Sequence, residues 1–214
     1  MTHNYLVLIA DIIASRQIVQ RAAFDASLKK ALDDLNARRQ GELLSPYTVT
    51  IGDEIQAVFG RADHVFGDVF TILAAVYPRR MRFSFSAGEL VTPINRERAI
   101  GMDGPAFHMA RERMDELKKS GHLFDVAIAE SAQDHALLRP VLELVSHEVK
   151  RWKRNRLEIL ALMMEGQTPH QIAERLGLSD QAVYKNIDAG ALGVMVDIFA
   201  QVSQHCNRLI QAQP

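Results

Sequence analysis

Apolar side chains recur with two different periods over residues 1–130. A continuous apolar run from Tyr5 to Ala10 is typical of a buried strand, whereas residues 81–90 alternate apolar with polar side chains. Residues 19–37 instead place apolar side chains three or four positions apart, which is helix spacing. The ranges predicted as strands are 5–10, 48–51, 55–59, 81–90 and 123–129, and those predicted as helices are 19–37, 63–77 and 104–119.

The order of these elements is strand, helix, two strands, helix, strand, helix, strand. Its core matches the ferredoxin-like split βαβ pattern. Gly52 and Asp53 separate the two consecutive strands and are a hairpin turn signal, so the first strand and this hairpin are expected to be neighbours. Residues 1–147 are therefore predicted to form an α+β domain with helices on one face of its sheet.

From about residue 136 onward the chain follows helix spacing. The last predicted helix, over residues 194–210, carries an apolar stripe that includes Cys206, whose expected role is packing. We expect residues 148–214 to form a second, small all-α domain.

Two short helices in this region have the spacing of a helix-turn-helix. Thr168 is a candidate N-cap, with Pro169 at the first helical position and Gln171 three residues after the cap. Gly177 ends this helix and Ser179 caps the next one, so a Gly-Leu-Ser turn joins the two.

Composition indicates an ordinary globular protein. The chain has 214 residues, of which 48 % are apolar and 24 % are charged. A single cysteine excludes an internal disulfide and fits a reducing compartment. No apolar run reaches the ~18 residues that a membrane span needs, and YLVLIA lacks the basic flank of a signal peptide. We therefore expect a cytoplasmic protein without a membrane partner.

Charge is balanced overall, with a formal net charge of −1, but basic residues gather in KRWKRNR, Lys150–Arg156. This segment is either the solvated start of a helix or a patch that contacts phosphates. The net charge alone is too small to argue for nucleic-acid binding.

Carboxylates interrupt two predicted strands. Asp11 ends the first strand, and Asp53 with Glu54 lies at the turn of the hairpin. Because these strands are expected to be neighbours, the carboxylates are expected to approach one another and to bind Mg²⁺ or Mn²⁺. The alternative is that Asp11 caps a helix while Asp53 and Glu54 are turn and surface residues.

Four segments resemble the catalytic domains of class III nucleotide cyclases. IADIIAS (9–15) and TIGDEIQAVF (50–59) resemble the two metal-aspartate motifs, FSFSAGELV (83–91) the following strand, and GPAFHMARER (104–113) the helix with the catalytic Asn and Arg. With its C-terminal helix-turn-helix, the whole chain resembles the SatD family more closely. That resemblance implies an architecture and not a reaction.

Three positions depart from the cyclase pattern. His108 replaces the catalytic Asn, Glu112 replaces the catalytic Arg, and Val49 replaces the base-reading residue. Since a group that stabilises transition-state charge is worth several kcal/mol, these departures disfavour cyclase activity. His108 and Arg111 share a helix face and are an alternative charge-stabilising pair for another phosphoryl reaction, although a lone His there is more often structural.

Two further binding roles are predicted. Ser15 and Arg16 are placed at the start of the first helix, where N–H groups favour a phosphate. In the second helix of the helix-turn-helix, the polar residues available to DNA are Ser179, Gln181, Tyr184, Lys185 and Asn186. Asp180 and Asp188 in the same helix weaken the case for DNA, and the alternative is a helix pair used for packing or dimerisation.

The main interpretation is a DNA-binding regulatory protein whose cyclase-like domain binds a divalent metal with a nucleotide or phosphate ligand. The alternative is a metal-dependent enzyme for phosphoryl or nucleotidyl transfer, with the helix-turn-helix as a protein-interaction module; a plain scaffold is a third. The sequence leaves open whether the chain is an enzyme. A homodimer is expected for a DNA reader of this kind, with the last helix at its interface.

Overall fold

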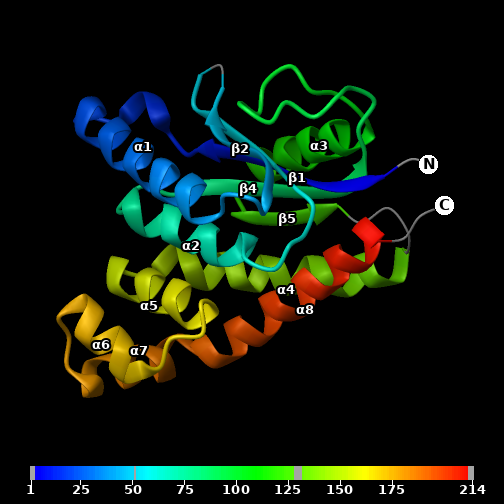
Figure 1. The fold of residues 1–214 in the computed structure, drawn as a ribbon. Coiled ribbons are helices and arrows are strands. Elements are labelled where there is room, and N and C mark those ends of the chain that lie inside the picture. Colours follow the sequence, from blue (N-terminus) through cyan, green and yellow to red (C-terminus); the bar gives the residue numbers. More distant parts are fainter. Residues whose placement is uncertain (1–2, 51, 128–131, 212–214) are drawn as a thin grey trace.

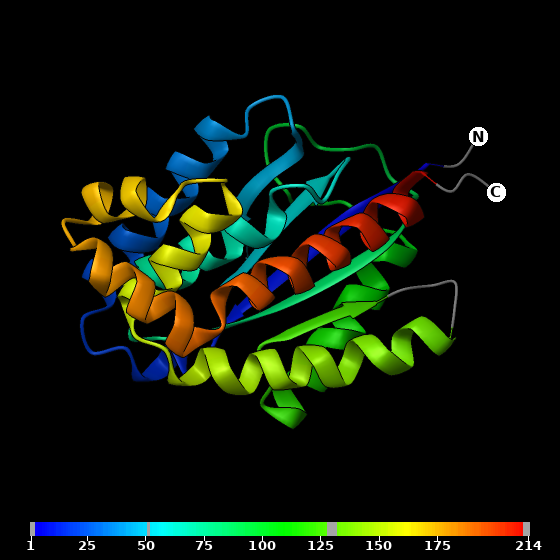
Figure 2. The same cartoon turned by 90° about the horizontal axis from the view of Figure 1, so that it is seen from below.

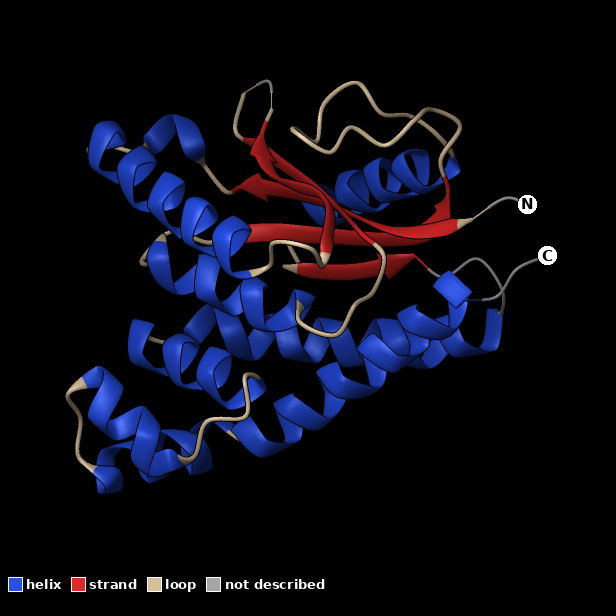
Figure 3. Ribbon diagram, in the orientation of Figure 1, coloured by secondary structure: helices blue, strands red, loops and turns tan. Residues whose placement is uncertain are grey.

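The computed structural model describes residues 3–50, 52–127 and 132–211 of the chain. Within these ranges one five-stranded sheet is flanked by helices on both sides (Figures 1 and 3). The strands are β1 (Asn4–Ile12), β2 (Leu43–Val49), β3 (Glu54–Phe59), β4 (Met81–Glu89) and β5 (Phe124–Ala127). The helices are the short 3-10 helix η1 (Ser15–Gln17), α1 (Arg21–Arg38), α2 (Val65–Ala75), α3 (Pro105–Ser120), α4 (Ala132–Arg151), α5 (Arg154–Met164), α6 (Pro169–Leu176), α7 (Asp180–Gly190) and α8 (Leu192–Gln211).

The sheet has the strand order β2-β3-β1-β4-β5, with β1 at its centre. β1 pairs antiparallel with both β3 and β4, so Leu8 lies between Ala57 and Phe85. Only β4 and β5 pair in parallel among the described strands. The predicted mixed α+β class and the predicted pairing of the first strand with the hairpin are both confirmed.

Helices cover both faces of the sheet, and the prediction that they lie on one face is wrong. Leu6 and Leu8 face a core built with α1, α2, α4 and α8, whereas Val7 and Ile9 face a second core under α3. Figure 2 shows α4 and α8 along one face of the strands. The reason is that β1 is apolar at every position from 6 to 10, so both of its faces must be covered.

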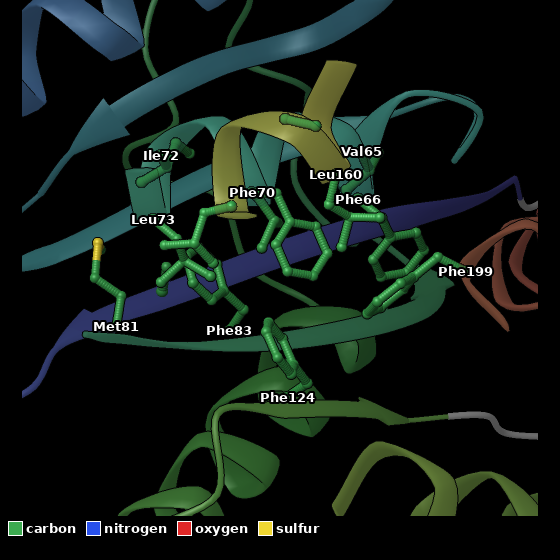
Figure 4. Close-up of a cluster of buried hydrophobic side chains, with 14 of the residues drawn as sticks. Val65, Phe66, Phe70, Ile72, Leu73, Met81, Phe83, Phe124, Leu160 and Phe199 are labelled. Carbon is green, nitrogen blue, oxygen red and sulfur yellow. The ribbon is translucent and has the colours of Figure 1, made fainter. Parts of the chain in front are cut away.

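Aromatic rings fill the larger core. Phe66 and Phe70 of α2 meet Phe124 of β5 and Phe199 of α8, as Figure 4 shows. The ring centroids of Phe66 and Phe199 are 4.9 Å apart. The last helix therefore completes a core that begins on the first strand.

A separate C-terminal domain is not confirmed. α5 packs on α2. The two helices are so close that a Cβ added at Gly67 of α2 would lie 3.5 Å from the Cβ of Met164 on α5. One buried cluster joins the sheet to α5, α6, α7 and α8, and it includes Ile172 of α6 and Val183 of α7. The predicted boundary between residues 147 and 148 falls inside α4 and stays a prediction.

Some element boundaries differ from those expected. β2 begins at Leu43 and not at residue 48, because it is an edge strand that tolerates Pro46 and two irregularities of register. Residues 51, 128 and 129 of the predicted strands lie outside the described residues. Among the described helices, none combines the length and the apolar character that crossing a bilayer requires.

Candidate functional site

Charged side chains gather where β1 ends and β3 begins, beside the hairpin turn. Asp11 pairs with Glu54 on β3 and with Arg82 on β4. Directly opposed residues of antiparallel strands point to the same face, with Cα atoms about 4.5–5.5 Å apart. Asp11 follows Val7 and Ile9 at two-residue intervals, so this face is the one that α3 covers.

Asp11 binds two cations from two other elements. Arg82 Nη1 donates to Asp11 Oδ2 at 3.0 Å, and Lys118 Nζ at the end of α3 lies 3.7 Å from Oδ1. Glu54 accepts a hydrogen bond from Gln56 Nε2 at 2.5 Å. Two carboxylates and two cations thus share one end of the sheet, with the Asp11 side chain 21 % exposed.

Asp53 belongs to a different set of contacts. It forms an ion pair with Arg21 at the start of α1, and Arg21 also donates to Asp25 at 2.8 Å. The hydrogen bond from Arg21, followed by one from Ser15, holds the pKa of the Asp53 carboxyl below its ordinary value. Asp53 is therefore a stable anion that α1 already contacts.

The predicted metal ligands Asp11, Asp53 and Glu54 lie at one end of the sheet but have separate partners. The neighbour of Asp11 across the strands is Glu54, whereas Asp53 contacts Arg21 and Ser15. The described residues contain no group of three or more His, Cys, Asp and Glu side chains arranged to hold a metal.

Ser15 and Arg16 were predicted at the start of the first long helix, but they do not lie there. They lie in the three-residue η1, and α1 begins later, at Arg21. Ala14, with a left-handed φ of 54°, precedes η1, and the extended Ile18 ends η1 and separates it from α1. Arg16 is exposed, while Ser15 binds Asp53.

The predicted pair on α3 lies away from Asp11. His108 Nε2 donates to Asp103 at 2.8 Å, and Arg111 is exposed. Lys118, which reaches Asp11, is ten residues after His108, or about 15 Å along the helix. The start of α3 is fixed at the far end of β4, where Gly104, with a φ of 148°, packs so closely on Leu90 that a Cβ would clash.

Arg21, Arg82 and Lys118 are not among the site residues predicted from the sequence. Arg82 occupies a polar position of the alternating strand, so its register with Asp11 would have revealed it. Lys118 and Arg21 offer no comparable signal, because their contacts depend on how two helices are packed against the sheet.

The helix-turn-helix has the predicted turn and caps. Thr168 and Gln171 form a reciprocal capping box, and Gly177 takes the left-handed conformation with a φ of 64°. Ser179 Oγ accepts a hydrogen bond from the N–H of Ala182 at 3.2 Å. α6 and α7 pack on one another and on α5, and Val183 of α7 is buried.

The five predicted DNA-contacting residues of α7 are not equivalent. Gln181, Tyr184 and Lys185 are exposed, and 54 % of Tyr184 is accessible. Ser179 is used by the helix cap, and Asn186 Nδ2 donates to the Ala182 carbonyl at 2.9 Å. An outward face of three polar side chains remains.

The basic segment at residues 150–156 is divided between packing and solvent. Trp152 is buried, and the Arg156 guanidinium lies 5.8 Å from its ring centroid. Lys150, Arg151 and Lys153 are exposed at the junction of α4 and α5. Arg154 is exposed as well, but it pairs with Glu158. The segment therefore supplies a structural anchor and three exposed cations besides this ion pair.

Cys206 is buried in α8, and burial raises the pKa of its thiol to about 12. A thiol with such a pKa stays protonated at neutral pH and is a poor nucleophile. The predicted packing role of this residue therefore agrees with its surroundings.

Comparison with known proteins places the chain in a family. The model of the SatD family matches residues 5–205. The chain belongs to the SatD family. No curated protein sequence matches this SatD chain.

Solved structures similar to this SatD protein include nucleotide cyclases. A bacterial light-regulated adenylyl cyclase is 14 % identical, with a TM-score of 0.44 over 59 % of this chain and 76 % of its own. The guanylyl cyclase Cya2 is 14 % identical, with a TM-score of 0.36 over 52 % of this chain and 71 % of its own. Values this low concern the fold alone and carry no conclusion about activity.

Proposed function

We propose that this SatD protein is a DNA-binding regulator, with α7 as its reading helix. The observation that carries this proposal is the outward face of α7, where Gln181, Tyr184 and Lys185 are exposed on a capped helix-turn-helix. A second helix of this kind enters the major groove, where Gln pairs with adenine and Lys with guanine or a phosphate. Lys150, Arg151 and Lys153 are further cations for the DNA backbone.

The regulatory ligand that we propose is a nucleotide or another phosphate compound that arrives with Mg²⁺ or Mn²⁺. Asp11 and Glu54 offer the one or two carboxylates that Mg²⁺ commonly takes from a protein when phosphates and waters complete its shell. Arg82 and Lys118 would then turn from Asp11 to the phosphate oxygens. Asp53, in the turn just before β3, would be a further carboxylate for the metal ion.

α1 offers a physical connection between this ligand and the DNA. Its first residue, Arg21, binds Asp53, while Arg38 and Arg39 at its other end bind Glu165. Glu165 ends α5, immediately before the helix-turn-helix. A ligand that competes with Arg21 for Asp53 would break the ion pair at the start of α1. The resulting shift of α1 would change its contacts with Glu165, just before α6.

The DNA proposal is tested by fluorescence anisotropy on a site selected from random DNA. Lys185→Ala should weaken binding and reduce the salt slope by about one if it contacts a phosphate. Gln181→Ala should relax base preference at one position, at a cost of about 1–3 kcal/mol. Lys119→Ala, an exposed change on α3, is the matched control. Unchanged binding by both α7 variants would remove the proposal.

A second candidate function is metal-dependent phosphoryl or nucleotidyl transfer. It is favoured by the neighbouring Asp11 and Glu54 with two cations at the same end of the sheet. In that case Arg82 and Lys118 would stabilise the charge on the transferred group, a role that His108 and Arg111 are too distant to fill within one chain.

Calorimetric titration with a nucleoside triphosphate and Mg²⁺ or Mn²⁺, followed by product analysis, separates the two functions. We expect metal-dependent binding by the wild type, lost in Asp11→Asn/Glu54→Gln. Recovery of unchanged nucleotide favours the regulator, and a metal-dependent product favours the enzyme. Asp115→Asn on the exposed side of α3 is the control, and no binding by the wild type would exclude both uses of this site.

A further inference from the structure

An apolar groove of about 560 Å³ runs between α4 and α8. Figure 2 shows these two helices side by side along one face of the molecule. Leu137 is 72 % exposed on α4 and Val194 is 58 % exposed on α8. The apolar lining residues are Leu137, Leu138, Val141, Val194, Ile198 and Val202. Apolar side chains gathered in this way indicate a contact surface.

Opposite charges border the groove along one line of α8. Asp197 and Arg208 both line it, and neither forms an ion pair with an oppositely charged side chain of the described chain. Eleven residues are about three helical turns, so the two charges share a face about 16 Å apart. Each is therefore available to a charge outside the chain.

A buried polar atom lies between these charges. Arg208 Nη2 lies 3.0 Å from His205 Nδ1, and His205 Nε2 is buried without a hydrogen-bond partner in the described structure. Because Nδ1 accepts from Arg208, the neutral ring carries its proton on Nε2 and needs an acceptor there. Gln201, one turn earlier, is exposed on the same groove with an amide oxygen that can accept.

We propose that two copies of this chain associate through the groove, with their α8 helices antiparallel about a two-fold axis near Val202. An isologous contact needs a surface that complements itself. Asp197 would face Arg208 of the second copy, a pair centred between residues 202 and 203. Gln201 would face His205 of the second copy, a pair centred on residue 203. Two independent pairs therefore define nearly the same axis.

The reciprocal Asp197–Arg208 pairs favour a second copy over other occupants. A lipid surface would leave the Asp197 carboxylate without a partner, and an unrelated helix would have to reproduce the same charges in reverse order. The second copy has them in that order because it is the same helix read in the opposite direction.

The spacing of the two helix-turn-helix units follows from this axis, a consequence that matters only if the proposed DNA function holds. α8 begins at Leu192, ten residues from Val202, so the two α8 starts would lie about 30 Å apart. Successive major grooves on one side of DNA are about 34 Å apart. The association itself does not depend on DNA binding.

Sedimentation equilibrium of the full chain tests the proposal without DNA. The wild type should show twice the 24.0 kDa mass of one chain. Asp197→Arg or Arg208→Asp alone should weaken the dimer about tenfold or more, because two attractions become repulsions. An equimolar mixture of the two variants should restore the dimer. In the mixed dimer one chain carries a cation at both positions and the other an anion at both, so both pairs are again attractive. Asp115→Arg and Lys119→Asp, exposed changes on α3, should leave the dimer intact.

Circular dichroism confirms that the variants are folded. If either charge variant is not, Leu137→Asp on the exposed side of α4 replaces it and should give a folded monomer. A wild type that sediments as a monomer would overturn the proposal. So would single variants that stay fully dimeric, or a mixture that does not recover. Loss of DNA binding with an intact dimer would instead count against the proposed function alone.

Discussion

The two ends of α1 carry similar ion pairs in very different surroundings. At its start, Arg21 binds Asp53 at a site where nearly half of the Arg21 side chain is exposed. Just beyond its end, Arg39 binds Asp68, of which 1 % is exposed. The same two residue types thus serve an open surface at one end and the interior at the other. Burial, and not residue type, separates a site that a ligand can reach from one that holds the fold together.

The buried pair of Arg39 and Asp68 is held by several hydrogen bonds. Arg39 donates from Nη2 to Asp68 Oδ1 at 2.9 Å, and Tyr47 donates its hydroxyl to Asp68 Oδ2 at 3.0 Å. Burial, followed by the charge of Asp68, raises the pKa of Tyr47 well above its ordinary value. Tyr47 therefore stays protonated at neutral pH and donates its hydroxyl proton to Asp68.

The largest expected effect is at the buried end. Asp68→Ala leaves the buried Arg39 guanidinium with only its longer contact to Glu165, at 3.5 Å, and should lower the free energy of unfolding by about 3–5 kcal/mol. Urea denaturation measures the change. The control is Asp33→Ala, which removes an exposed helix pair with Lys29 and should cost less than about 0.5 kcal/mol. Equal losses in the two variants would contradict the distinction between the two ends.

A smaller effect is expected at Tyr47. Tyr47→Phe removes one donor to Asp68 while Arg39 remains, so the free energy of unfolding should fall by about 1–2 kcal/mol. Tyr184→Phe is the matched control, since this tyrosine is exposed on α7, and it should leave thermal stability unchanged. A loss at Tyr47 as large as that of Asp68→Ala would mean that the tyrosine, and not Arg39, holds the carboxylate.

The smallest effect on stability is expected at the open end. Because the pKa of Asp53 is lowered in the folded chain, its contribution to stability is present above its unfolded pKa of about 3.9 and is lost as the pH falls through the folded value. Arg21→Ala should raise the pKa of Asp53 toward the ordinary range and weaken this acid dependence. Carboxyl NMR titration measures the pKa directly.

Arg61→Ala is the control for that titration, because Arg61 contacts Asp63 and should leave Asp53 unchanged. If the pKa of Asp53 is already ordinary in the wild type, the ion pair with Arg21 is too weak to transmit a ligand signal through α1.

Much of the fold was predictable because it depends on local patterns. The period of the apolar side chains placed β1 and α3, and the caps at Thr168 and Ser179 placed α6 and α7 to within a residue or two. The second layer of helices was not predictable from these patterns. Apolar side chains on both faces of β1 show that both faces are covered, but not which helix covers each.

The candidate site was predictable only in part. Asp11 and Glu54 meet because the first strand pairs with the hairpin, which strand order and turn signals indicate. Arg82 and Lys118 reach Asp11, and Arg21 reaches Asp53, from three separate elements, so these contacts follow from packing. The prediction of His108 and Arg111 rests on the resemblance of residues 104–113 to the cyclase helix and on their spacing, and neither fixes where along the sheet a helix lies.

The core of the sheet cannot be completed during synthesis until α8 has been made. β1 emerges first, yet Phe199 of α8 is needed to close the aromatic cluster beside it, and Asn4 binds the carbonyl of Leu209. Until α8 has left the exit tunnel, the face of the sheet that it covers stays open to solvent. We therefore expect the nascent chain to expose an apolar sheet face while α4 to α7 are synthesised, and such a surface is prone to aggregation.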